Sequence, residues 1–145
     1  MNQEEIKKIL PHRDNMLLVE QAEVVDGKAH AQYQVRGDEF FLQGHFPDNP
    51  VVPGVILCEM MAQGACVLLA DRAQSAESMQ GYTPMLTSMN NVRFKKPVLP
   101  GDLFESESEI TKSKGPFYFC AAKGYVKGEL VCRAEYSFAL VKSEA

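Results

Sequence analysis

One long helix-forming segment limits the possible folds of this chain more than any other feature. Residues 55–72, VILCEMMAQGACVLLADR, follow Pro53-Gly54 and are rich in Leu, Met and Ala, which favour helix. The segment is apolar on nearly every face, and a helix of that kind needs cover on all sides. Its most apolar stretch, residues 55–70, is interrupted by Glu59 and Gln63 and is too short to span a bilayer. We therefore expect a buried core helix.

Most of the remaining sequence is typical of β-structure. A capping box at Asn2 and Glu5 predicts a short helix, Gln3–Ile9. An Asp26-Gly27 turn predicts a hairpin between strands at residues 16–25 and 29–35. Residues 37–53 are interrupted by Gly and Pro and predict an irregular loop. Four further strands are expected after the helix, at residues 85–94, 102–112, 117–126 and 129–141.

Six strands and one fully buried helix predict an α+β fold. A curled antiparallel sheet wrapped around one long central helix gives that helix the cover it needs, and a dimer partner can complete the cover. This arrangement is the hotdog fold. A ferredoxin-like sandwich fits less well, because the second half of the chain offers no other amphipathic helix. The length of 145 residues predicts a single domain, residues 1–145.

Composition argues against several classes of function. The net charge of −4 is unlike the basic surplus of a nucleic-acid binder. The opening residues MNQEEIKKIL lack the pattern of a secretory signal, so we expect a cytoplasmic protein that does not bind membranes. The spacing of the Cys and His residues does not match a zinc site, and there is no GxGxxG motif or P-loop. We expect chemistry without a metal or cofactor, and four buried free thiols at Cys58, Cys66, Cys120 and Cys132.

The candidate chemical groups lie in residues 44–65. Glu59 lies within the apolar helix, where a carboxyl group should be neutral, paired or facing a cavity. His45 lies in the preceding loop, which three prolines stiffen. Gly54 at the helix start leaves a backbone N–H free, and helix N-termini favour developing negative charge. An acid, a base and an N–H donor can together remove a proton next to a thioester carbonyl.

Three segments resemble one enzyme family. GHFPDNPVVPGVILCEMMAQ, residues 44–63, resembles the signature of the bacterial (3R)-hydroxyacyl-[acyl-carrier-protein] dehydratases of fatty-acid biosynthesis. LPHRDNMLLVE, residues 10–20, and VRFKKPVLPGD, residues 92–102, resemble other segments of that family in the same order. The resemblance implies a hotdog fold, no cofactor, and an acyl carrier protein that delivers the acyl chain. It also implies a homodimer, assembled further as a trimer of dimers.

The resemblance also assigns roles to single residues. His45 matches the catalytic histidine and Glu59 the catalytic carboxylate, with His45 of one subunit facing Glu59 of the other. Gly54 matches the backbone donor to the thioester oxygen, and Gln63 matches the glutamine that orients the carboxylate. The reaction implied is loss of water from a (3R)-hydroxyacyl thioester to give a trans-2-enoyl thioester.

Two segments outside this signature have other interpretations. We interpret His12 and Arg13 as structural residues that pin the N-terminal segment. The residues that follow them, Asp14-Asn15-Met16, depart from the aromatic–Pro–Phe sequence that is more common in the family. A basic cluster, Arg93, Lys95 and Lys96, either docks the acidic carrier protein or is a solvated strand end.

Alternative functions remain compatible with the sequence. On the same fold, the two candidate residues could support thioester hydrolysis, or dehydration followed by double-bond isomerisation. From another class, a non-catalytic acyl-binding subunit would share the fold, and loss of His45 or Glu59 would indicate it. Both residues are present.

Overall fold

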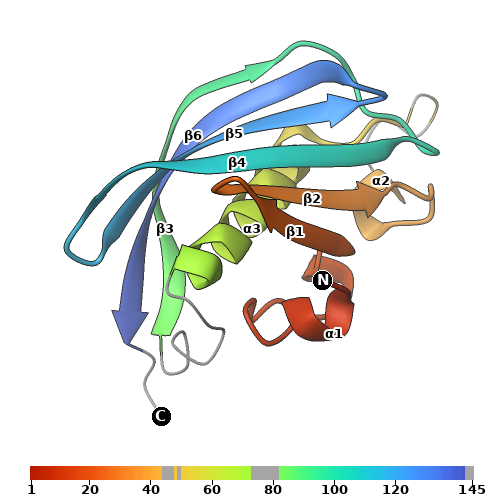
Figure 1. The fold of residues 1–145 in the computed structure, drawn as a ribbon. Helices are drawn as coiled ribbons and strands as arrows, with labels where there is room; N and C mark the ends of the chain where they lie inside the picture. Colours follow the sequence, from red (N-terminus) through yellow and green to blue (C-terminus); the bar gives the residue numbers. More distant parts are fainter. Residues whose placement is uncertain (44–47, 49, 73–81, 143–145) are drawn as a thin grey trace.

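The computed structural model describes residues 1–43, 48, 50–72 and 82–142 of the chain (Figure 1). Two short helical turns and a hairpin come first, then a short helix, the long helix and four long strands. In chain order the elements are α1 Gln3–Ile6, the 3₁₀ turn η1 Asp14–Met16, β1 Gln21–Val25, β2 Lys28–Gln34, α2 Phe40–Gln43, α3 Gly54–Arg72, β3 Tyr82–Phe94, β4 Leu103–Lys114, β5 Phe117–Val126 and β6 Glu129–Lys142.

The strands form one antiparallel sheet in the order β1-β2-β4-β5-β6-β3. Tight turns join the hairpins, as the sequence predicts. Asp26 and Gly27 have φ of 52° and 76°, and Lys127 and Gly128 have φ of 52° and 77°. Two successive residues with positive φ form the turn whose twist matches that of the strands it connects. These turns fix which side chains of each strand face the core.

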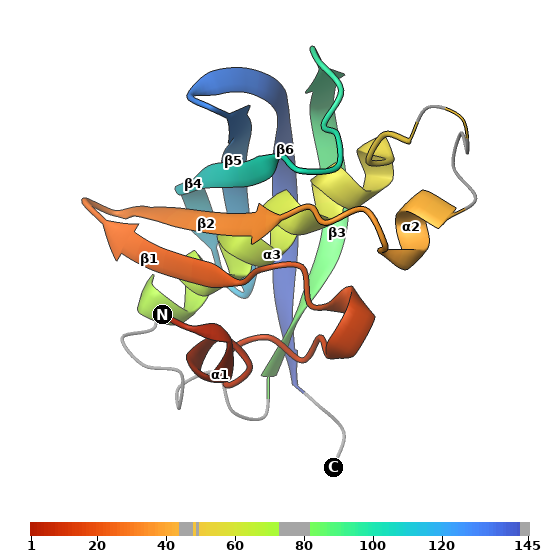
Figure 2. The ribbon, with the colours of Figure 1, turned by 90° about the vertical axis from the view of Figure 1, so that its right-hand side faces the viewer.

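Helix α3 lies across the concave face of the curled sheet (Figures 1 and 2). The facing side of β6 carries the buried row Cys132, Ala134, Tyr136 and Phe138, as the alternating sequence predicts. Along α3, buried residues occur at most positions, so the helix is the centre of the core. The hotdog arrangement predicted from the sequence is confirmed.

Several predicted boundaries are wrong. The first helix ends at Ile6, and a second short helix, α2, lies in the predicted loop. The first strand begins at Gln21, because the backbone at Met16 and Leu18 bonds to α3, although the Glu20 N–H still donates to the Gln32 carbonyl of β2 (2.9 Å). The side-chain oxygen of Gln63 accepts a hydrogen bond from the Leu18 N–H (2.8 Å), and its amide nitrogen donates to the Met16 carbonyl (2.8 Å). Strand β3 begins three residues earlier than predicted, at Tyr82.

The core helix is long and apolar enough to cross a membrane by length and composition alone. Its window Gly54–Asp71 has a mean hydropathy of 1.5, so the expectation that the segment is too short is wrong. However, 72% of that window is buried inside the fold. The apolar character of α3 therefore reflects its place between the sheet and the N-terminal segment.

Strand β3 is a long edge strand with an exposed apolar surface. It pairs with β6 on one side, and no other strand of the described residues pairs with it. Five of its large apolar side chains are exposed: Tyr82, Met85, Leu86, Met89 and Phe94. Proteins usually protect such an edge with charge, proline or a covering element.

Candidate active site

Glu59 lies in the second turn of α3, between the buried residues Cys58 and Met60. Its side chain keeps 31% of its accessible surface. The helix therefore buries Glu59 only in part in the single chain, and its side chain keeps access to solvent. Such a carboxyl group can reach a ligand and can still exchange a proton.

His12 lies beside this carboxyl group. Its Nε2 is 3.7 Å from Glu59 Oε1, and its side chain is 26% exposed. The pattern of the sequence gave no signal for this contact, because the two residues are far apart in the chain and His12 precedes the first strand. The structural interpretation of His12 is thus incomplete, since the residue also reaches the candidate catalytic group.

Gln63 lies one turn further along α3 and is almost fully buried, at 1% exposure. Both polar atoms of its amide bond the backbone at Met16 and Leu18. These two hydrogen bonds hold the segment between His12 and β1 against α3. Orientation of Glu59 by Gln63 stays a prediction.

Gly54 starts α3 and lies under the aromatic ring of Phe94 at the end of β3. A Cβ atom added at Gly54 would lie 2.8 Å from Phe94 Cζ and 3.0 Å from Cε1. Only glycine allows this close approach of ring and backbone. The first N–H groups of an α-helix have no partner within the helix, so the N–H of Gly54 can serve as a donor to a ligand there.

His45 lies outside the described residues. The structure describes the chain on both sides of it: α2 ends at Gln43, and α3 begins at Gly54. The predicted position of His45 beside Glu59 therefore stays a prediction.

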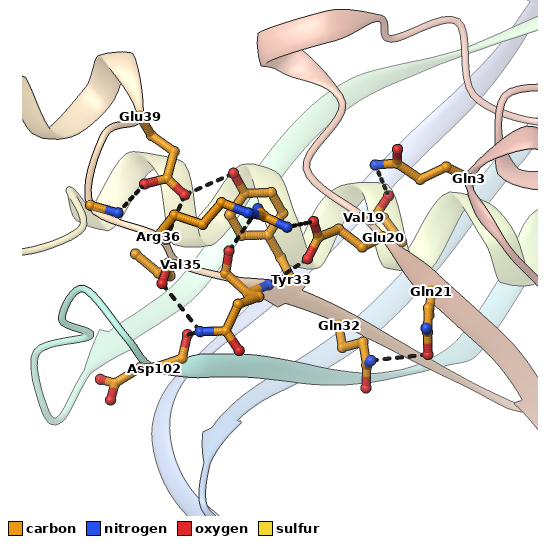
Figure 3. Close-up of polar contacts among 12 residues, drawn as sticks. Gln3, Val19, Glu20, Gln21, Gln32, Tyr33, Val35, Arg36, Glu39 and Asp102 are labelled. Carbon is orange, nitrogen blue, oxygen red and sulfur yellow. Dashed lines mark hydrogen bonds and ion pairs between the residues drawn. The ribbon is translucent and has the colours of Figure 1, made fainter.

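A polar network holds the chain where it leaves β2 and approaches α2 (Figure 3). The carboxylate of Glu39 accepts hydrogen bonds from the N–H groups of Arg36 (2.9 Å) and Gly37 (2.8 Å), and from the hydroxyl of Tyr33 (3.0 Å). The guanidinium of Arg36 in turn donates to the carboxylate of Glu20. This network fixes the start of the segment that carries α2 and the candidate loop.

The network depends on the charge of Glu39. Burial raises the pKa of Glu39, but the hydrogen bonds from Arg36, Gly37 and Tyr33 outweigh it, so the pKa lies below its usual value. Burial and the neighbouring Glu39 raise the pKa of the Tyr33 hydroxyl, which stays a donor. Ionised Glu39 is therefore the form that stabilises this part of the fold.

We expect Glu39→Gln to destabilise the protein at neutral pH by about 1 kcal/mol, a value discounted for the solvent exposure of the site. Because the pKa of Glu39 is lower in the folded protein, its contribution is present above the unfolded pKa and is lost as pH falls through the folded one. Unfolding midpoints should therefore differ at pH 7 and converge below about pH 4. Glu109→Gln, at an exposed position of β4, is the control. A difference that persists at low pH would contradict the prediction.

The predicted basic cluster is exposed at the end of β3, and the structure extends it. Lys96 forms an ion pair with Glu129. Arg93 pairs in register with Arg133 of β6, which pairs with Lys123 of β5. Arg93, Lys123 and Arg133 are exposed, and none of them forms an ion pair with another described residue. Like charges directly opposite on neighbouring strands repel each other, so this row favours an anionic partner.

The cysteines are buried and free, as predicted. Burial raises the pKa of the thiols of Cys66, Cys120 and Cys132, which keeps them protonated. Within residues 1–43, 48, 50–72 and 82–142, no three His, Cys, Asp or Glu side chains form a group that could hold a metal ion.

Comparison with known protein families shows which family the chain belongs to. A family model described as a FabA-like domain matches residues 10–135, which include α3 and five of the six strands in full. The chain belongs to the FabA-like family. This membership agrees with the dehydratase resemblance of the sequence and with the observed fold.

Curated FabA-like relatives match almost the whole chain. A 3-hydroxyacyl-[acyl-carrier-protein] dehydratase of Clostridium perfringens is 43% identical over 141 residues, covering 97% of this chain and 99% of the relative. The enzyme of the same name from Caldicellulosiruptor saccharolyticus is 45% identical over 138 residues, covering 93% and 95%. Alignments with this coverage leave no large segment of either chain unmatched.

Solved structures confirm the fold. A dehydratase heterocomplex from Xenorhabdus doucetiae superposes with a TM-score of 0.82 at 21% identity, covering 96% of this chain and 92% of that one. A thioesterase-like protein from Ralstonia eutropha superposes with a TM-score of 0.64 at 17% identity, covering 83% of each. At these identities the likeness supports the fold alone.

Proposed function

We propose that this FabA-like chain is a 3-hydroxyacyl-[acyl-carrier-protein] dehydratase of fatty-acid biosynthesis. The observation that carries the proposal is near-complete alignment, at 43% identity, with a curated dehydratase of that name. The site agrees with it, since Glu59 is partly exposed in the second turn of the helix that starts at Gly54. The substrate is a (3R)-hydroxyacyl chain on its carrier, and the products are the trans-2-enoyl thioester and water.

The reaction needs one base, one acid and one oxyanion donor. Neutral His45 takes the proton from C2, which the thioester carbonyl makes acidic. Negative charge builds on the carbonyl oxygen, and the Gly54 N–H at the start of α3 stabilises it. Protonated Glu59 gives its proton to the leaving C3 hydroxyl, and water departs. The C2–C3 double bond forms from the electrons of the C2–H bond, so atoms and charge balance.

A direct assay separates this function from its closest rival. Dehydration forms a conjugated enoyl thioester, which is detected by its absorbance, whereas thioester hydrolysis releases a free thiol. We expect the enoyl signal without thiol release from hydroxyacyl-carrier substrates. Thiol release without enoyl formation would show a thioesterase on the same fold. Neither signal, from a folded protein, would indicate a non-catalytic acyl-binding subunit.

A homodimer through β3 completes the proposed enzyme. The edge of β3, which pairs with no described strand except β6, supports it together with five exposed apolar side chains, because a second copy can cover both. The further trimer of dimers rests on the family resemblance. Light scattering distinguishes the states as two or six times the 16.2 kDa chain. We place the enzyme in the cytoplasm, in keeping with the burial of its apolar helix.

The basic row supports docking of the acidic carrier. We propose that Arg93 and Lys95 bind the carrier together with Arg133 and Lys123, while Lys96 is partly neutralised by its ion pair with Glu129. The row is exposed, and its cross-strand repulsion falls when an anionic surface covers it.

Charge reversal at Arg93 and Arg133 should raise the KM for carrier-bound substrate by about tenfold or more, since the charges act mainly on encounter. Turnover of a short thioester without carrier should change little. Added salt should weaken the wild-type reaction with carrier, because exposed charges are screened beyond roughly 8–10 Å. Lys28→Glu, at the far hairpin, is the control. Equal loss on both substrates would point to damaged folding and reject the docking surface.

A further inference from the structure

We propose that His12 is a positioning residue that holds Glu59 through one carboxyl oxygen and leaves the other oxygen free to deliver the proton. The inference rests on the proposed dehydration, because it concerns the acid of that reaction. It assigns a role in the chemistry to a segment that the sequence analysis treated as structural.

The first observation is the geometry of the pair. His12 Nε2 lies 3.7 Å from Glu59 Oε1, just beyond hydrogen-bond length, and both side chains are partly exposed. The other ring nitrogen, Nδ1, is buried and has no hydrogen-bond partner among the described residues. The imidazole thus has one nitrogen available for a polar contact, and that nitrogen faces Glu59.

The buried nitrogen selects the tautomer. A buried N–H without an acceptor costs more than a buried lone pair without a donor, since the N–H is the more strongly solvated group that is lost. The hydrogen of neutral His12 therefore belongs on Nε2, where it can be donated to Glu59. In this tautomer His12 is a donor to the carboxyl group and does not compete for its proton.

The second observation is how firmly His12 is held. The guanidinium of the next residue, Arg13, donates to three backbone carbonyls: Leu10 (2.7 Å), His12 (2.7 Å) and Lys7 (3.1 Å). On the other side, Gln63 binds the backbone of Met16 and Leu18. The segment that carries His12 is thus fixed to the same helix that carries Glu59. Because the backbone is already held, the contact with Glu59 costs only the entropy of the two side chains.

The contact has a chemical consequence. A protonated carboxyl group has one carbonyl oxygen and one hydroxyl, and a donor at Oε1 leaves the proton on Oε2. When that proton moves to the departing hydroxyl, Glu59 gains negative charge, and the His12 N–H stabilises it more than it stabilised the neutral acid. An interaction that strengthens as the reaction proceeds raises kcat and leaves KM nearly unchanged.

Other titratable groups near Glu59 cannot take this role. Cys66 of α3 and Tyr136 of β6 are close enough for the charge of Glu59 to act on them. Burial is the main cause that raises the pKa of both groups, so both stay neutral. The Tyr136 hydroxyl is also occupied, because it donates to the Cys58 carbonyl (2.7 Å). Among the described residues, His12 is left as the polar partner of the carboxyl group.

The test compares His12→Leu, which removes the donor, with His12→Gln, whose Nε2 can still donate to Oε1. We expect His12→Leu to lower kcat by about tenfold or more, less than the 10²–10³-fold cost of losing a direct oxyanion donor, with little change in KM. His12→Gln should recover most of that loss. His30→Leu, on the outer face of β2, is the matched control and should behave as wild type.

The outcomes separate this inference from the proposed function. If wild type forms enoyl product and Glu59→Gln does not, but His12→Leu keeps normal kcat, the role of His12 is rejected and the dehydratase stands. Equal losses in His12→Leu and His12→Gln, with lower unfolding midpoints, would reduce His12 to a packing residue. If wild type itself forms no enoyl product, the proposed function fails first.

Discussion

Replacement of His45 with Ala should lower dehydration by roughly two to four orders of magnitude, the usual contribution of a positioned general base. The C2 proton of a thioester is too weakly acidic for water to remove at a useful rate. Glu59 cannot replace His45 as base, because the mechanism requires Glu59 to carry a proton when the substrate binds. The loss should fall on kcat, since the imidazole acts on the reacting proton.

The measurement is enoyl absorbance at saturating hydroxyacyl-carrier substrate, with the unfolding midpoint as a check on folding. Glu59→Gln provides the companion result: the amide fits the half-exposed place of Glu59 without a charge, so the fold should remain while activity collapses. His30→Ala is a control for loss of an imidazole elsewhere. A folded His45→Ala protein with near-normal rates would reject the base assignment. An active but destabilised Glu59→Gln would make Glu59 a structural ion-pair residue.

The architecture could be predicted from the sequence because its strongest patterns have few structural solutions. A helix without a polar face must lie in a core, and the alternation through Cys132, Ala134 and Tyr136 must face that helix. The Asp26-Gly27 turn set the register of its hairpin through two positive φ angles. These are local rules, and each acts over a few residues.

The missed features depend on contacts between distant segments. The predicted first strand was too long because the Leu18 N–H donates to the side chain of Gln63, 45 residues away in the chain, instead of to a neighbouring strand. The contact of His12 with Glu59 has the same origin, since α3 brings the two residues together across the N-terminal segment. Neither contact changes the periodicity of apolar residues along the sequence, so neither could be predicted from it. The polar side chain of Gln63 on a largely apolar helix was the one available hint that another segment bonds there.

We propose that the candidate site extends beyond the single chain. Glu59 is partly exposed in the protomer, and the apolar edge of β3, which pairs with no described strand except β6, is one that a second copy can cover. Both features suit an enzyme whose site is completed at a two-fold interface. The family resemblance implies the missing component, His45 of the partner subunit. The two catalytic residues would then belong to different chains, so a complementation test with two inactive variants is possible.

Two inactive proteins, His45→Ala and Glu59→Gln, should regain activity when their subunits are exchanged. Random exchange makes about half of the dimers mixed. One of the two sites in each mixed dimer then combines wild-type His45 with wild-type Glu59, so about a quarter of normal activity should return. If both residues of a site came from one chain, every site would keep a lesion and nothing would return.

The exchange itself has to be demonstrated, for example by co-purification of two differently tagged chains after mild denaturation and refolding. Mixing His45→Ala with the double variant His45→Ala/Glu59→Gln is the matched control, because no combination of those chains contains an intact pair. Recovery near a quarter in the first mixture and none in the second would establish the shared site. Full exchange without recovery would place both groups on one chain. In that case the exposed edge of β3 would serve assembly alone, and the loop that carries His45 would have to turn back toward its own helix.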